Sequence, residues 1–157
     1  MAKIILQTEV QAPIERVFDL ARNIDLHKAS ASKTNEEAIA GKTSGLIELN
    51  ETVTWRARHF GVYQKLTVKI VELDRPNMFK DIMLKGTFKS MSHTHKFEEK
   101  DDVTIMHDTF EFESPLGLLG KIANHLFLKR YMTTFLVTKN QVLKHVAESD
   151  SWDSFLG

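Results

Sequence analysis

Residues 62–70 read VYQKLTVKI, a stretch in which apolar and polar side chains alternate. A period of two predicts an antiparallel strand with one face buried and the other in water. Similar runs are found at about 51–59, 78–84, 87–99 and 103–113. Gly61 and the short polar stretches between the other runs have the composition of turns. The middle of the chain is therefore expected to form a meander of antiparallel strands.

The segment before this meander predicts one more strand and two short helices. Residues 3–10 have the composition of a strand and alternate moderately. Pro13 then stands where a helix accepts proline, at its first position. Val17, Leu20 and Ile24 follow at helical spacing. We therefore expect two short helices between residues 13 and 32.

The segment after the meander predicts a long C-terminal helix. Ser114 is a suitable N-cap, Pro115 is a suitable first helical residue, and apolar residues follow densely from 116 to 146. Basic side chains interrupt this stretch, so we do not expect it to cross a bilayer. On a helical wheel the apolar arc rotates by roughly half a turn near Phe127. This rotation predicts a break near residues 125–129, with a short helix followed by a long one.

The composition is typical of a single globular domain. The chain has 157 residues, of which 42% are hydrophobic and 27% charged, and we place the domain at 1–148 with 149–157 as a flexible tail. A formal charge of zero provides no bulk field to attract nucleic acid. The absence of cysteine excludes disulfides, thiol catalysis and cysteine-ligated metals. The first residues lack the apolar core of a signal peptide, which predicts a cytoplasmic location. The oligomeric state stays open.

Four short motifs add to this order of elements. They are APIERVF at 12–18, VTW at 53–55, HTHKF at 93–97 and SPLG at 114–117. Over about residues 3–147 the chain resembles the START/SRPBCC superfamily, which includes bacterial polyketide cyclase/dehydrase-like and lipid-transport proteins. The resemblance implies an α+β helix-grip fold: a curved antiparallel sheet of about six or seven strands wrapped around a long C-terminal helix, with two short helices after the first strand. It also implies an apolar cavity between sheet and helix.

Strand parity places several polar residues on faces that are otherwise apolar. Burying such a group unpaired costs about 1–3 kcal/mol, so each one either lines a pocket or has a partner. An apolar cavity with a few convergent polar groups is the usual composition of a small-molecule site. An internal hydrogen-bond network that closes a filled core would use the same residues. The predicted ligand-binding residues are Trp55, His59, Gln64, Met91, His93, His95, Phe97, Asp108, Phe110, Met132, Phe135 and Lys139.

Three functions fit this pattern. The leading hypothesis is binding of a small hydrophobic molecule, such as the lipids, quinones, sterols or polyketides that the resemblance implies. The first alternative is an enzyme of the cyclase or dehydratase kind, with His95 and Asp108 as an acid–base pair. The second is a protein-interaction module with a filled core and an exposed apolar patch. No nucleophile motif and no phosphate-binding glycine fingerprint is present, which favours a protein that is not an enzyme and holds no cofactor.

The two histidines of the HTHKF motif raise the question of a metal site. His93 and His95 lie at i and i+2, so on a strand they face the same side and could ligate one ion, with His59 or Asp108 as a third ligand. A cupin-type site also requires a glutamate a few residues further along. Glu98 lies one residue too close for this pattern. The sequence therefore predicts no metal.

Overall fold

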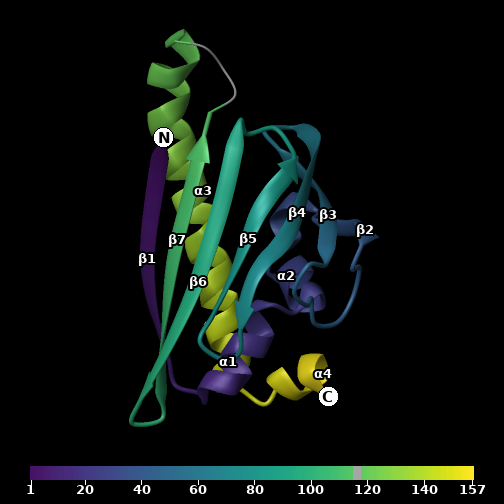
Figure 1. Ribbon diagram of the computed structural model, residues 1–157, viewed down its shortest axis with the longest axis vertical. Helices are drawn as coiled ribbons and strands as arrows, with labels where there is room; N and C mark the ends of the chain where they lie inside the picture. The colour runs from purple at the N-terminus through teal and green to yellow at the C-terminus, as the bar shows by residue number, and fades with distance from the viewer. Residues whose placement is uncertain (115–117) are drawn as a thin grey trace.

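The computed structural model describes residues 1–114 and 118–157 and contains seven strands and a long C-terminal helix (Figure 1). The strands are β1 (Ala2–Val10), β2 (Glu37–Gly41), β3 (Thr52–His59), β4 (Val62–Asp74), β5 (Met78–Lys85), β6 (Ser90–Lys100) and β7 (Val103–Glu113). The helices are α1 (Ile14–Ala21), α2 (Ile24–Ser30), the short 3₁₀ helix η1 (Ser32–Thr34), α3 (Leu118–Glu148) and α4 (Trp152–Leu156). The predicted α+β class and the two short helices after β1 are confirmed.

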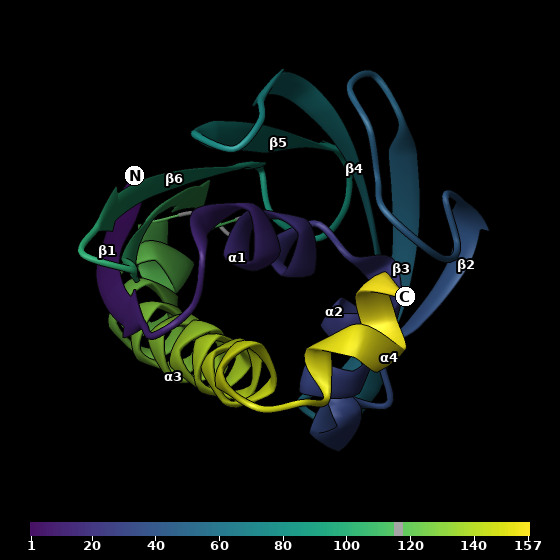
Figure 2. The same cartoon turned by 90° about the horizontal axis from the view of Figure 1, so that it is seen from below.

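All seven strands belong to one antiparallel sheet in the order β1-β7-β6-β5-β4-β3-β2. β7 shows the predicted alternation most clearly, because every second residue from Thr104 to Phe112 is buried. Seen from below, the sheet forms an arc with α1 and α3 on its concave side (Figure 2). The inward side chains of the strands and one side of α3 therefore share a common interior. This arrangement is the helix-grip architecture predicted from the sequence.

The C-terminal helix differs from the prediction at one point. α3 is a single uninterrupted helix from Leu118 to Glu148, so the predicted division near residues 125–129 is wrong. The first turns of α3 extend past the ends of the strands (Figure 1). Leu126 and Phe127 are 67% and 57% exposed, so the helix leaves these apolar side chains uncovered and does not rotate its axis to bury them. The predicted role of Pro115 as the first helical residue lies outside the described residues, and Ser114, predicted as the N-cap, is the last residue described before them.

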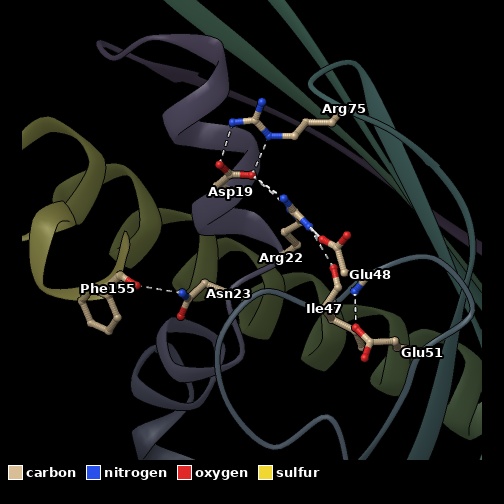
Figure 3. Close-up of polar contacts among 8 residues, drawn as sticks. All are labelled: Asp19, Arg22, Asn23, Ile47, Glu48, Glu51, Arg75 and Phe155. Carbon is tan, nitrogen blue, oxygen red and sulfur yellow. Dashed lines mark hydrogen bonds and ion pairs between the residues drawn. The ribbon is translucent and has the colours of Figure 1, made fainter. Parts of the chain in front are cut away.

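Helix α1 is held to the sheet by aromatic packing and by an ionic network. Phe18 is fully buried, and its ring packs edge-on against Phe79 and Phe97 at centroid distances of 5.4 and 5.2 Å. Asp19 accepts hydrogen bonds of 2.8–3.0 Å from Arg22 and Arg75 (Figure 3). Burial alone would raise the pKa of Asp19, but these hydrogen bonds outweigh it and lower the pKa. The network ties α1 to the turn after β4.

The loop before β3 and the C-terminus also join this region. Arg22 donates to the carbonyl oxygen of Ile47 at 3.2 Å and contacts the carboxylate of Glu48. Asn23 donates to the carbonyl oxygen of Phe155 in α4 at 3.2 Å (Figure 3). The guanidinium of Arg16 lies 4.1 Å from the centre of the Trp152 ring, a cation–π contact between α1 and α4. The flexibility predicted for residues 149–157 stays a prediction.

Within residues 1–114 and 118–157, none of the helices combines the length and apolar character that spanning a membrane requires.

Candidate functional site

A cavity of about 590 Å³ lies between the concave face of the sheet, α2 and α3. Its walls are mainly apolar and aromatic, and its volume falls in the range typical of small-molecule sites. All but two of the predicted ligand-binding residues line it. They are Trp55, His59, Gln64, Met91, His93, His95, Phe110, Met132, Phe135 and Lys139. Contact of these residues with a ligand stays a prediction.

Phe97 and Asp108 are the two predicted residues that do not line the cavity. Phe97 points toward α1, where it packs against Phe18. Asp108 is 2% exposed and lies behind the imidazoles of His93 and His95. Strand parity identified the correct face for both residues. It did not show that α1 covers Phe97 or that the imidazoles of His93 and His95 stand in front of Asp108.

The first polar group of the cavity wall is a cluster of two carboxylates and two imidazoles. Oδ1 of Asp108 lies 2.7 Å from Nε2 of His93 and 3.3 Å from Nδ1 of His95. Nε2 of His95 lies 3.2 Å from Oδ2 of Asp81. Asn140 of α3 donates a hydrogen bond of 2.8 Å to Oδ2 of Asp108. The cluster therefore joins β5, β6, β7 and α3 behind one wall of the cavity.

The charges within this cluster follow from its contacts. Burial alone would lower the pKa of His95, but hydrogen bonds to Asp108 and Asp81 outweigh it and raise the pKa to about 9. Burial and the neighbouring charge of His95 lower the pKa of His93. Burial would raise the pKa of Asp108, but its hydrogen bonds to both imidazoles hold it well below the ordinary value. The raised pKa favours the imidazolium form of His95 between two carboxylates, and the lowered pKa favours the neutral form of His93.

The second polar group contains Glu36, His27 and Lys139. Nε2 of His27 contacts Nζ of Lys139 and lies 2.7 Å from Oε1 of Glu36. Nζ of Lys139 lies 3.7 Å from the same carboxylate oxygen. The His27 ring stacks on Trp55 at a centroid distance of 4.1 Å. A single ring nitrogen can accept from the lysine or donate to the glutamate, but it cannot do both. When Lys139 donates to His27, Oε1 of Glu36 has no hydrogen-bond partner in the described structure.

The buried carboxylate of Glu36 makes the stability of the protein depend on pH. Burial would raise the pKa of Glu36, but Lys139 and His27 outweigh it and lower the pKa from 4.5 to about 2. A folded-state pKa below the unfolded value contributes stability above pH 4.5 that is lost as the pH falls toward 2. We expect Glu36 to account for a loss of about 3 kcal/mol over this window.

This loss is measured by urea unfolding between about pH 5 and about pH 2.5 in the wild type and in Glu36→Gln. The wild type should lose more stability than the variant, because glutamine does not titrate. Equal acid dependence of the two proteins would contradict the assignment to Glu36.

The cavity opens beside the turn between β3 and β4. Phe60 in this turn is 53% exposed, Phe127 of α3 is similarly exposed, and both line the cavity. Their rings lie 5.5 Å apart, and Phe60 also packs against Tyr131 at 4.5 Å. The hydroxyl of Tyr131 is hydrogen-bonded to Nδ1 of His59. Exposed aromatic side chains therefore form a rim at the entrance.

Sequence reasoning missed several residues of the site. Asp81 follows Phe79 by two positions on β5, so the parity argument applied to the other strands would have placed it inside. His27 follows Ile24 by three positions, which is the spacing of one helix face. Asn140 is adjacent to Lys139 on α3. Glu36 precedes a short strand without alternation, and no pattern in its neighbours marks it as buried.

Comparison with known proteins identifies the fold. No known family profile matches the chain, and no curated protein matches it. Solved structures do match. TTHA0849 from Thermus thermophilus is 18% identical with a TM-score of 0.72, and the alignment covers 93% of this chain and 99% of the other. A START superfamily protein from Mycobacterium smegmatis is 12% identical with a TM-score of 0.71, covering 93% and 97%.

A plant protein shares the same architecture. The major latex-like protein 151 of Panax ginseng is 15% identical with a TM-score of 0.66, and the alignment covers 94% of this chain and 98% of the other. Together these structures show that the chain has the START/SRPBCC fold. The fold that the sequence motifs predicted is confirmed, although identity at this level carries no assignment of ligand or activity.

Proposed function

We propose that this protein binds a small hydrophobic molecule in the cavity between its sheet and α3. The observation that carries the proposal is a cavity of about 590 Å³ with mainly apolar walls and two buried polar clusters. Removing a ligand from water against these walls contributes about 25 cal/mol for each Å² of apolar area. A lipid, quinone, sterol or polyketide-like molecule has the apolar area that this mechanism needs.

The polar clusters give such a ligand an orientation. Lys139, His27 and Glu36 lie beside Trp55, whereas His93 and His95 lie on β6, so the wall carries two groups of polar side chains. A mainly apolar molecule with one or two oxygen atoms fits this distribution. We keep the cytoplasmic location and the absence of a nucleic-acid partner, both predicted from the sequence, as parts of this proposal.

Binding is favoured over the two alternatives by geometry. An acid–base pair of His95 and Asp108 requires both groups to reach the substrate, yet Asp108 lies behind the imidazoles and does not line the cavity. An interaction module with a filled core predicts no cavity of this size. The cavity therefore supports a binding protein.

Native mass spectrometry of the protein purified from cells, followed by denaturing extraction, tests the proposal. We expect a reproducible added mass that extracts as a hydrophobic molecule. Titration with the fluorescent probe 1-anilinonaphthalene-8-sulfonate adds a measurement that does not depend on a retained ligand.

Two matched variants locate the binding. Ala57 lines the cavity, so Ala57→Trp fills part of it and should weaken probe binding by at least about tenfold. Ile5 is exposed on β1, outside the cavity, and Ile5→Trp should bind the probe as the wild type does. Equal binding by the wild type and Ala57→Trp, with both folded, would contradict a ligand in this cavity.

A further inference from the structure

We propose that Asp81, His93 and His95 form a binding site for a divalent first-row metal ion of the Zn²⁺ type. Asp81 of β5 lies directly opposite His93 of β6 in the sheet. His95 lies two residues further along β6, so its side chain emerges on the same face. One ligand atom from each of the three residues lies within 4.8 Å of the others. The sheet itself therefore brings together two imidazoles and one carboxylate.

The spacing of these atoms is close to that of a metal centre. In a tetrahedral zinc site with bonds of about 2.1 Å, two ligand atoms lie about 3.4 Å apart. Oδ2 of Asp81 and Nε2 of His95 are 3.2 Å apart, close to this spacing, so an ion bound to both would displace the proton between them and lie to one side of the line that joins them. The widest separation in the group, at most 4.8 Å, requires a side-chain shift of about 1.4 Å to reach the same spacing.

Asp108 accepts hydrogen bonds from the imidazoles, as carboxylates beside metal-binding histidines normally do. A ligating imidazole usually donates its other ring N–H to a carboxylate, which fixes the orientation of the ring. Asp108 lies 2.7 Å from Nε2 of His93 and 3.3 Å from Nδ1 of His95, and Asn140 fixes Asp108 in turn. Nε2 of His95 faces Asp81, and one ring nitrogen of His93 lies within 4.8 Å of the ligand atoms of both residues. Among the described residues, no hydrogen bond to Nδ1 of His93 is found.

The third ligand is not one that the sequence suggested. His59 is hydrogen-bonded to Tyr131 and does not belong to the group. Asp108 stands behind both imidazoles. The prediction of no metal rested on a failed cupin spacing within one strand. Asp81 comes from β5, whereas His93 and His95 come from β6. A rule based on spacing along one strand does not detect ligands that come from two strands.

The arrangement leaves a coordination position facing the cavity. Asp81, His93 and His95 all line it. Three protein ligands with a fourth position open are typical of zinc sites that bind water or a substrate oxygen. An ion held here would attract an oxygen atom of a molecule in the cavity. The inference does not rest on the proposed function, because metal binding is measured without any hydrophobic ligand.

The test is a titration of chelator-stripped protein with Zn²⁺ in competition with a fluorescent metal indicator. We expect one equivalent of tightly bound ion. Asp81→Asn and His93→Ala should each weaken binding at least tenfold, and Asp108→Asn should weaken it about 10–100-fold. His107→Ala is the matched control, since His107 is the neighbouring histidine on the outer face and pairs with Glu98. It should bind Zn²⁺ as the wild type does.

Co²⁺ provides a second measurement on the unaltered protein. Its visible absorption should show a site of low coordination number with nitrogen and oxygen ligands, and one equivalent of Zn²⁺ should abolish the signal. Circular dichroism establishes that each variant is folded. Binding of less than one equivalent by the wild type would overturn the proposal. Equal affinity of the wild type and a folded Asp81→Asn would also overturn it.

Discussion

Replacing Asp108 with alanine is expected to lower the free energy of unfolding by about 3–5 kcal/mol. The carboxylate is 2% exposed and lies within hydrogen-bonding reach of His93, His95 and Asn140. Its removal leaves the imidazolium of His95 with only one of its two carboxylate partners. It also leaves the side-chain amide of Asn140 without its charged acceptor. Urea denaturation with linear extrapolation measures the change.

The control for this prediction is the adjacent residue in the chain. His107 points to the outer face of β7, where it makes only an exposed pair with Glu98. His107→Ala should change the stability by less than about 0.5 kcal/mol. A loss below about 1 kcal/mol in Asp108→Ala would show that the cluster contributes little to folding. In that case we would assign the cluster a role in ligand or metal binding and none in stability.

Replacing Lys139 with methionine is expected to lower the free energy of unfolding by about 3 kcal/mol. The ammonium group is the cation nearest to the buried carboxylate of Glu36, at 3.7 Å, and also contacts His27. Burial lowers the pKa of Lys139, but the attraction of Glu36 opposes this effect. Methionine fills a similar volume without the charge. The loss of stability therefore measures the cost of leaving the Glu36 carboxylate without its cation.

A second substitution separates this explanation from a packing defect. In the double variant Lys139→Met with Glu36→Gln, no uncompensated charge is left in the interior, and most of the stability should return. Lys89→Met is the exposed control, because Lys89 forms a surface pair with Glu113 and should contribute less than about 1 kcal/mol. If the double variant were no more stable than Lys139→Met, the ion pair would not be the cause.

The fold could be predicted because its elements have simple periodicities. The alternation along β4 and β7 defines strands with one buried face, and the motif at 12–18 marks the start of α1. The predicted break in α3 was wrong for a reason that lies outside the helix. A helical wheel assumes that every apolar side chain must be covered, whereas Leu126 and Phe127 extend beyond the sheet and stay exposed.

The site could be predicted only in part. Parity along each strand gives the face on which His93, His95 and Asp108 lie. Which of these side chains lines the cavity and which lies behind the others depends on the neighbouring strands. Asp81 joins the cluster through the pairing of β5 with β6, which no local pattern contains. Glu36 is buried because α2 and α3 bring His27 and Lys139 against it. Contacts of this kind depend on the tertiary structure.

The pairing of β1 with β7 has a consequence for how the protein is made. β1 is at one edge of the sheet, and its neighbour β7 is the last strand of the chain, with Ala2 opposite Phe112. At about 5–20 residues per second, a ribosome completes β7 on the order of 5–20 s after β1. During that interval the apolar residues of β1 have no strand to pair with. The nascent chain therefore exposes an unpaired strand, a feature that favours aggregation, and slower synthesis lengthens the exposure.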